Sequence, residues 1–326
     1  MQLPASIRTA FDLTLEGISR KALAARAEAI STRYRTKGSA TDSSQIIRTP
    51  EDALAYALVR MPATFAAVRA ALLAAVAAHP DFAPTSLLDA GAGPGTAAWA
   101  ALETWSSLTD LTLIDQNAAL LSLARNIAAQ IEGPTQPVFA HGTLPGALEK
   151  TSAADLVLAS YALTELAPQQ LATTLNALWQ RTAQMLVVVE PGTTEGFRRM
   201  HTCRTQLIAA GAQILAPCTH HEACPLATAE RWCHFNQRLP RLRDHIAVKS
   251  ASSPFEDERY SYLIALRTPI ERNQRRRILA TPVVNKGQIT LSLCAPRTCE
   301  AHPIPRSNKT LYKQARHFDW GDAVEL

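Results

Sequence analysis

Between residues 84 and 200, short apolar runs alternate with longer segments in which apolar residues recur at helical spacing. A short apolar run bounded by turn residues is typical of a buried strand, whereas a 3.6-residue spacing is typical of a helix. The runs predict strands at Ser86–Asp89, Leu111–Asp115, Val138–His141, Asp155–Ser160 and Met185–Glu190. The intervening and following segments predict helices at Gly95–Glu103, Asn117–Ile131, Pro168–Arg181 and Thr194–Ala210. This alternation indicates an α/β fold in which helices cover a parallel sheet.

The first 80 residues have helical spacing without strand-like runs, at Ala22–Ile30 and Pro50–Ala78. Thr49 is a favourable N-cap for the second of these helices, and Pro62 predicts a kink within it. We therefore expect a helical region that packs on the α/β part of the chain and carries no chemistry of its own.

The C-terminal third departs from the alternation. A cysteine-bearing insertion at 212–258 precedes a strand at Tyr260–Leu266 that belongs to the same sheet. Beyond it we predict short strands at Arg277–Val284, Gln288–Cys294 and Thr310–Ala315, with a hairpin turn at Asn285–Gly287. The predicted domains are a helical region (1–80), an α/β domain with its insertion (81–268) and a small basic β unit (269–326).

Composition narrows the class of protein. The 326 residues are 47% apolar, which is ample for a buried core. The apolar runs are interrupted before they reach the length of a membrane span, and Asp12 and Glu16 interrupt any secretory signal, so we expect a cytoplasmic protein without membrane association. The net charge is +5, and basic residues gather near the C-terminus, as in a nucleic-acid-binding surface or a solvated face. No heptad or interface stripe indicates an oligomeric state.

A glycine-rich turn, Leu87–Thr96, follows the first predicted strand and opens a helix. Gly91, Gly93 and Gly95 allow a sharp turn and a close approach of a ligand to backbone N–H groups. The segment from Asp89 to Thr96 has the shape of the first motif of class I S-adenosylmethionine (SAM) methyltransferases. A dinucleotide fingerprint fits less well, because the glycine or alanine pattern does not continue at Thr96.

An acidic residue ends the second predicted strand, about 20 residues after the glycine turn. Asp115 is placed to hold a ribose hydroxyl pair, with Gln116 beside it. Ligands of such sheets bind at the carboxyl ends of the strands, where several polar residues converge. The predicted cofactor-binding residues are Asp89, Gly91, Gly93, Gly95, Asp115 and Gln116, and further residues at strand ends are His141, Ser160, Tyr161 and Glu190.

All six cysteines lie beyond residue 200. Clustered cysteines in an intracellular chain favour metal binding or catalysis over disulfides. Four thiolates suit zinc or an iron–sulfur cluster, and the nearby histidines could replace a thiolate at a zinc site. The spacing of Cys218, Cys224 and Cys233 is neither a zinc-ribbon nor a ferredoxin pattern, so it indicates a metal without fixing which one.

Several further motifs, taken together, resemble one family: the methyltransferase-like assembly factors of the mitochondrial small ribosomal subunit and their bacterial homologues. The resemblance covers residues from about 50 to the C-terminus. The matching motifs are Arg60-Met61-Pro62-Ala63-Thr64, the glycine turn, Val189-Glu190-Pro191-Gly192-Thr193, Cys218-Thr219-His220, Cys224-Pro225-Leu226, Trp232-Cys233-His234-Phe235, Glu256-Asp257-Glu258 and Trp320-Gly321-Asp322.

The resemblance implies a class I SAM-binding fold, a [4Fe–4S] cluster and a role in maturing the small ribosomal subunit through its RNA. It implies Cys218, Cys224, Cys233 and Cys294 as cluster ligands, with Cys299 as the rival for the fourth position. Zinc is the alternative metal.

The place of a catalytic motif is occupied by an unusual sequence. Nucleic-acid amino-methyltransferases commonly carry an Asn/Asp-Pro-Pro-aromatic motif after the fourth strand, where this chain has Ser160-Tyr161-Ala162-Leu163-Thr164-Glu165. Two hypotheses follow: a SAM-dependent methyltransferase of small-subunit ribosomal RNA, and a non-catalytic RNA-binding assembly factor that uses the same fold as a scaffold. Catalytic residues are not assigned.

Overall fold

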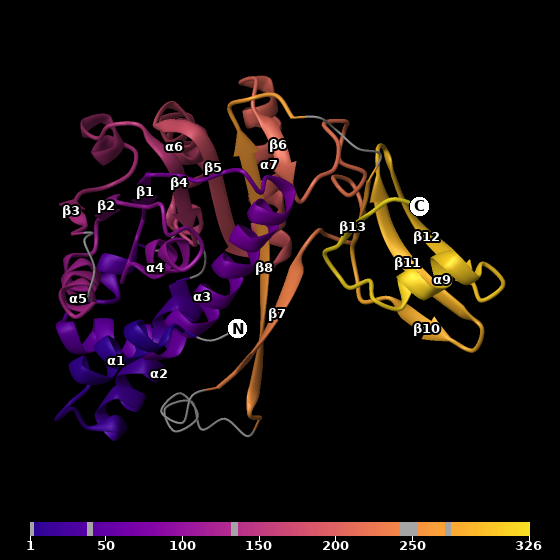
Figure 1. The fold of residues 1–326 in the computed structure, drawn as a ribbon. Helices are drawn as coiled ribbons and strands as arrows, with labels where there is room; N and C mark the ends of the chain where they lie inside the picture. Colours follow the sequence, from indigo (N-terminus) through magenta and orange to yellow (C-terminus); the bar gives the residue numbers. More distant parts are fainter. Residues whose placement is uncertain (1–2, 38–41, 132–135, 242–252, 271–274) are drawn as a thin grey trace. The chain divides into compact units, whose positions relative to one another are not determined.

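The computed structural model describes residues 3–37, 42–131, 136–241, 253–270 and 275–326 (Figure 1). The chain forms two compact units, each built from two segments. The first unit contains Met1–Glu190 and Gln237–Glu258, and the second contains Pro191–Asn236 and Arg259–Leu326. One boundary lies within strand β8 (Phe255–Leu266), so these units do not coincide with the predicted domains.

Parallel strands in the order β3-β2-β1-β4-β5 form the sheet of the first unit. They are β1 (Ser86–Ala90), β2 (Asp110–Asp115), β3 (Val138–His141), β4 (Ala154–Ser160) and β5 (Thr182–Pro191). Leu87 pairs with Leu111 on one side and with Leu156 on the other, so β1 is central and apolar. The order reverses between β1 and β4, which is the point where open α/β sheets bind ligands. The predicted Rossmann-like α/β fold is confirmed.

Helices follow the strands close to their predicted positions. They are α4 (Thr96–Leu102), α5 (Ala118–Ala129) and α6 (Pro168–Gln180), with short 3₁₀ turns η1 (Ser43–Gln45), η2 (Gly146–Lys150) and η3 (Leu163–Glu165). Asn117 caps α5 by accepting hydrogen bonds from two backbone N–H groups of its first turn. The cap fixes where β2 ends and α5 begins, and thereby positions Asp115.

The N-terminal region contains helices α1 (Ala5–Thr14), α2 (Arg20–Lys37) and α3 (Pro50–Ala78). A capping box between Thr49 and Asp52 starts α3, which runs on through Pro62 as one helix. Among the residues that the structure describes, α3 is the one helix that could cross a membrane by length and composition, contrary to the expectation from the sequence. However, 56% of its most apolar window is buried, and α3 contacts α2, α4 and α5, as a core helix does.

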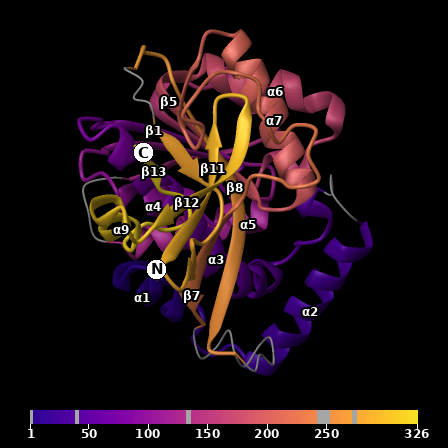
Figure 2. The ribbon, with the colours of Figure 1, turned by 90° about the vertical axis from the view of Figure 1, so that its right-hand side faces the viewer.

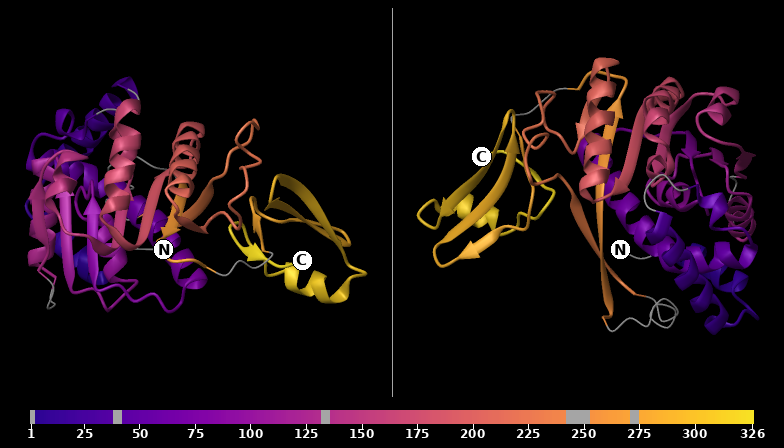
Figure 3. Two further views of the ribbon diagram at one scale, coloured as in Figure 1. Left: turned by 90° about the horizontal axis from the view of Figure 1, so that it is seen from above. Right: turned by 180° about the vertical axis from the view of Figure 1, so that it is seen from behind.

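Strand β7 (Phe235–Pro240) and the first half of β8 run side by side as a two-stranded ribbon (Figure 3). Arg238 and Asp257 form a bidentate ion pair across the ribbon, with both N–O distances at 2.8 Å. Glu258, the next residue along β8, is 8% exposed. The ribbon therefore brings a buried carboxylate into the first unit from a distant part of the sequence.

In the second unit, α7 (Thr194–Ala209) leads to β6 (Gln213–Ala216), which pairs antiparallel with the end of β8. A separate sheet follows, in which β11 pairs with β10, β9 and β12 (Figure 2). Its elements are β9 (Arg276–Ile278), β10 (Val283–Asn285), β11 (Gln288–Ala295), β12 (Thr298–Pro305), α9 (Lys309–Ala315) and β13 (Ala323–Val324). Buried Ile289, Leu291 and Leu293 of β11 contribute to its core.

Two predictions in this region are wrong. Thr310–Ala315 is a helix, because Asn308 accepts a hydrogen bond from the Leu311 N–H and caps it. The predicted strand Arg277–Val284 is divided into β9 and β10, which pair with opposite halves of β11. The hairpin turn is confirmed: Asn285 faces Gln288, and Gly287 has a φ of +86°.

Candidate functional site

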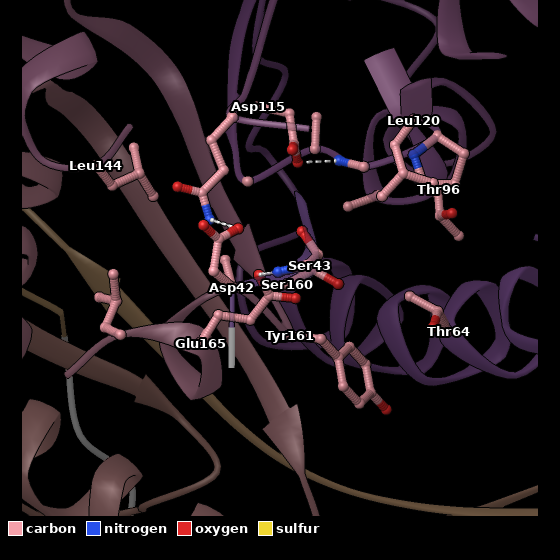
Figure 4. Close-up of a pocket in the computed structure, with 18 of the residues that line it drawn as sticks. Asp42, Ser43, Thr64, Thr96, Asp115, Leu120, Leu144, Ser160, Tyr161 and Glu165 are labelled. Carbon is pink, nitrogen blue, oxygen red and sulfur yellow. Dashed lines mark hydrogen bonds between the residues drawn. The ribbon is translucent and has the colours of Figure 1, made fainter. Parts of the chain in front are cut away.

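A cavity of about 640 Å³ opens at the carboxyl ends of β1, β2 and β4 (Figure 4). The glycine turn forms part of its wall, and acidic and hydroxyl side chains form another part. The lining residues whose side chains can bind or react with a ligand include Asp42, Ser43, Asp115, Gln116, Ser160, Tyr161 and Glu165. Its position is the ligand-binding position of open α/β sheets.

Two of the three predicted glycines, Gly91 and Gly93, line this cavity. Gly91, Gly93 and Gly95 all have positive φ, at 76°, 55° and 81°. A Cβ at Gly91 would lie 2.4 Å from the Ala162 Cβ, so the loop after β4 closes tightly on this position. Gly95 does not line the cavity, because it packs on the Trp99 ring at the start of α4.

Asp115 lies where the sequence predicts a cofactor-binding acid. Its two carboxylate oxygens accept hydrogen bonds from the backbone N–H of Gly93 at 2.7 Å and of Asn117 at 2.6 Å. The side chain thus ties the glycine turn to the end of β2. Each oxygen keeps a second lone pair that can accept a hydroxyl of a ligand. Burial raises the pKa of Asp115, while these two hydrogen bonds lower it.

Asp89 lies behind the glycine turn, outside the cavity lining. It is fully buried and accepts a hydrogen bond from the Ala98 backbone N–H at 3.1 Å, so it holds the first turn of α4. Burial raises its pKa to about 7. The second oxygen, Oδ1, is buried without a hydrogen-bond partner among the described residues.

A short segment, Asp42–Ile47, contributes to the cavity lining and is held by side chains from two other places, η3 and the turn between β2 and α5. The Ser43 N–H donates to Glu165 Oε2 at 3.1 Å, and the Gln116 amide donates to Asp42 Oδ1 at 3.1 Å (Figure 4). The Asn117 amide donates to the Ile47 carbonyl at 3.0 Å. We call this segment the strap.

Glu165 is an acid of the cavity whose pKa is strongly raised. Burial raises its pKa to about 8, the Ser43 N–H lowers it, and the charges of Asp115 and Asp42 raise it further. Three carboxyl groups therefore surround the same space, and one of them, Glu165, takes up a proton near neutral pH. The region favours a cationic ligand, since a positive charge would relieve their mutual repulsion.

Tyr161 follows β4 at a positive φ of 55°, and its ring points away from the carboxyl groups (Figure 4). Its hydroxyl donates to Glu258 Oε1 at 2.8 Å, and the same oxygen lies 3.0 Å from the Arg60 guanidinium. Burial, followed by the charge of Glu258, raises the pKa of the Tyr161 hydroxyl. The arrangement holds Tyr161 rigidly as a neutral hydrogen-bond donor at the edge of the cavity.

The structure brings five of the six cysteines together in the second unit. Cys294 and Cys299 face each other across β11 and β12, and the thiol of Cys294 lies 3.9 Å from His220 Nε2. Burial raises the pKa of Cys294, and the neighbouring thiols of Cys299, Cys218, Cys233 and Cys224 raise it further. Cys203 is buried separately on α7. Within the described residues, no three His, Cys, Asp or Glu side chains already form a closed metal-ligand set.

Sequence reasoning missed the strap and the acid Glu258. Asp42 and Ser43 belong to a polar stretch without a recognisable motif, and their contacts are with Gln116 and Glu165, which are distant in sequence. Arg60 and Glu258 each stand in a family-like motif, which is the one sequence signal that could have singled them out.

Curated relatives cover most of this chain but are longer proteins. The human mitochondrial ribosome assembly protein METTL17 is 29% identical over 293 residues, which are 84% of this chain and 62% of that protein. Rsm22-cox11 tandem protein 2 of Schizosaccharomyces pombe, also mitochondrial, is 25% identical over 87% of this chain and 44% of its own length. The chain thus spans less than two thirds of either relative. Their names contradict the cytoplasmic location expected from the sequence, and that expectation is wrong.

Solved methyltransferases align with the α/β part at low identity. Magnesium protoporphyrin IX methyltransferase of Synechocystis is 13% identical, with a TM-score of 0.42, over 63% of this chain and 84% of that one. A family model described as mitochondrial small ribosomal subunit Rsm22 matches residues 50–325. Since that match covers most of the sequence, the chain belongs to the Rsm22 family.

Proposed function

We propose that this protein binds SAM and acts in the assembly of the small ribosomal subunit. The family match and the name of the human relative, a ribosome assembly protein, support the assembly role. The observation that carries SAM binding is the cavity at the reversal of the sheet, with the glycine turn on one side and Asp115 on another. Asp115, Gln116 and the glycine turn would hold the cofactor.

The chemistry of the cavity fits SAM. SAM carries a sulfonium and an ammonium group. Asp42 and Asp115 place carboxyl groups on the cavity lining, and Glu165 adds a negative charge once it ionises. A free lone pair on each Asp115 oxygen can accept a ribose hydroxyl. When bound, SAM would supply an electrophilic methyl group. The protein's own contribution would be to orient that group, since positioning accounts for much of the barrier lowering in group transfer.

Calorimetry with purified protein tests this proposal. We expect SAM to bind more tightly than its demethylated product, which lacks the sulfonium charge. Asp115→Ala should weaken SAM binding at least tenfold, which corresponds to about 1.4 kcal/mol. Asp110→Ala is the matched control, because Asp110 is exposed at the start of the same strand. No detectable binding at millimolar SAM would refute the cofactor part.

We also propose that Cys218, Cys224 and Cys233, with Cys294 or Cys299, bind a [4Fe–4S] cluster or zinc. The donor set fits in kind, because soft thiolates suit both metals and the five thiols neighbour one another. A metal would tie the segment after β6 to the second sheet. Anaerobic purification followed by an absorption spectrum and iron, sulfide and zinc analysis tests the proposal. A protein without any of these metals would overturn it.

Small-subunit ribosomal RNA is the proposed partner. It would be the substrate of a methyltransferase, or the RNA that a non-catalytic assembly factor binds and holds.

The non-catalytic alternative is favoured by one observation: the side chains that could act as a base already form hydrogen bonds within the protein. Tyr161 donates to Glu258, and Glu165 accepts from Ser43. To act as a base, Tyr161 would have to give up its contact with Glu258 and Glu165 would have to use its other oxygen, whereas a scaffold needs neither change.

Complementation separates the two functions. Cells that lack this protein are supplied with wild type or with Asp115→Ala, and small subunits and RNA methylation are analysed. A methyl mark that wild type restores and Asp115→Ala does not identifies a methyltransferase. Full restoration of subunits by Asp115→Ala identifies a scaffold. A protein that does not sediment with small-subunit particles in either case would refute the assembly role.

A further inference from the structure

Arg277 occupies a buried position in line with two of the clustered cysteines. In the antiparallel sheet of the second unit, Cys294 pairs with Arg277 of β9 on one side and with Cys299 of β12 on the other. Directly opposed residues of antiparallel strands project from the same face. The guanidinium and the two thiols therefore form a row across three strands.

The charge of Arg277 has no carboxylate partner among the described residues. Its side chain is 9% exposed, and it donates to the carbonyls of Pro217, at 2.7 Å, and of Gly321. Other arginines of the same sheet are paired with glutamates, Arg276 with Glu300 for example. A buried charge that meets only neutral carbonyls is unfavourable unless an anion lies near it.

A second buried arginine binds the chain between Cys218 and Cys224. Arg204 of α7 is 5% exposed and donates to the carbonyls of His220 and Glu222, at 2.9 and 2.8 Å. Its Nε is buried without a hydrogen-bond partner in the part of the chain that the structure describes.

Both guanidinium groups act on the thiols electrostatically. Burial raises the pKa of Cys233. The neighbouring thiols of Cys218 and Cys224 raise this pKa further, and the charge of Arg277 lowers it. Burial raises the pKa of Cys224, and Arg204 counteracts that effect. Arg277 pairs with Cys294 in the sheet, and Arg204 binds carbonyls of the segment between Cys218 and Cys224, so both positive charges lie near the cysteines that would bind a metal.

We infer that Arg277 and Arg204 compensate the charge of a thiolate-bound metal centre in the second unit. Four thiolates around a divalent centre leave two negative charges, which two buried guanidinium groups balance. The inference rests on the proposed metal site and adds what that proposal does not contain, namely the residues that make an anionic centre tolerable in this interior. Arg277 also holds the chain next to Cys218, through the carbonyl of Pro217.

The test compares Arg277→Gln with Arg276→Gln, because the adjacent Arg276 is ion-paired and less buried. The proteins are reconstituted anaerobically with iron and sulfide, or with zinc, and metal release to a chelator is followed. We expect Arg277→Gln to lose metal about tenfold faster than wild type, in line with effects of other groups around metal ligands. Arg276→Gln should match wild type. If the centre contains iron, Arg277→Gln should also have a more negative reduction potential, a change that a purely structural role would not cause.

Arg277→Lys keeps the charge but not the two-carbonyl geometry, so it separates charge from structure. Arg277→Lys should retain metal and have a reduction potential near the wild-type values. If Arg277→Gln is insoluble, Arg277→Lys is compared with wild type directly. Wild-type release rates and potential in Arg277→Gln, or failure of lysine to restore them, would overturn the inference. A wild-type protein that takes up no metal would instead refute the proposed metal site itself, and the two failures are thereby distinguished.

Discussion

Gly91 carries the strictest steric requirement of the glycine turn. An added Cβ there would meet Ala162 at 2.4 Å, and the backbone is left-handed. Left-handed strain costs about 1 kcal/mol and overpacking about 1–3 kcal/mol more, so Gly91→Ala should lower the free energy of unfolding by about 3 kcal/mol. Gly17→Ala is the control, because Gly17 has a φ of +75° but open space around it. Equal destabilisation in urea titrations would contradict the role assigned to Ala162.

Glu165 makes both stability and ligand binding depend on pH. The pKa of Glu165 is about 8 in the folded protein, whereas the ordinary value, which applies to the unfolded chain, is 4.5. Between these two pH values the folded state therefore binds one proton more than the unfolded state. Stability should therefore fall as pH rises through this window, while affinity for a cation should increase as Glu165 ionises. Glu165→Gln should reduce both slopes, leaving the contribution of Asp115. Unchanged slopes in denaturation and SAM titration would refute this assignment.

At the scale of residues, the sequence predicts the position of those parts of the cavity that are close together in the chain. The glycine turn and Asp115 could be predicted because strand, turn and acid follow one another at fixed spacing. The contact of Ser43 with Glu165 spans 122 positions, and that of Tyr161 with Glu258 spans 97. Such pairs are fixed only by tertiary packing, so no local pattern announces them.

Helix α3 begins at a capping box whose removal has a calculable effect. The Thr49 hydroxyl accepts the Asp52 N–H, and the Asp52 carboxylate accepts the Thr49 N–H. Thr49→Ala should lower the free energy of unfolding by about 1 kcal/mol, because one orphan donor of the helix start is left unsatisfied. Thr49→Ser keeps the hydroxyl and should be nearly neutral. Equal thermal denaturation midpoints for the two variants would show that the cap does not contribute.

At the scale of elements, the parallel strands could be predicted and the small sheet only in part. Short apolar runs that alternate with helical segments are typical of buried parallel strands, and the strands β1 to β5 lie where they are expected. Thr310–Ala315 is short and mixed, so the Asn308 cap decided its structure rather than the residues themselves. Strand β12 (Thr298–Pro305) contains two prolines and little apolar alternation, which concealed it.

At the scale of the whole molecule, each compact unit is assembled from two distant segments. The second segment of the first unit brings Glu258 to Tyr161. The second unit gathers thiols from Cys218–Cys233 and from the β11–β12 hairpin. Composition along the sequence does not indicate that a compact unit is assembled from two distant segments. The predicted domain limits therefore differ from the boundaries of the two units. The proposed metal would then join the two segments of one unit.

Removing the metal should therefore unfold the second unit before the first. A structural metal stabilises by several kcal/mol because the ligands are not assembled in the unfolded chain, and a change of that size lowers the midpoint of a domain of about 100 residues by about 10 °C or more. We expect Cys224→Ser, or a chelator added to wild type, to produce an early thermal transition that leaves SAM binding intact.

The fourth ligand follows from the same measurement. Of Cys294→Ser and Cys299→Ser, only the variant that removes a ligand should reproduce the early transition, because the opposed thiol lies beside the site without binding the metal. Cys203→Ser, on α7, should not release metal. A Cys224→Ser protein with a full metal content and a single wild-type transition would show that the thiols of the second unit do not bind a structural metal.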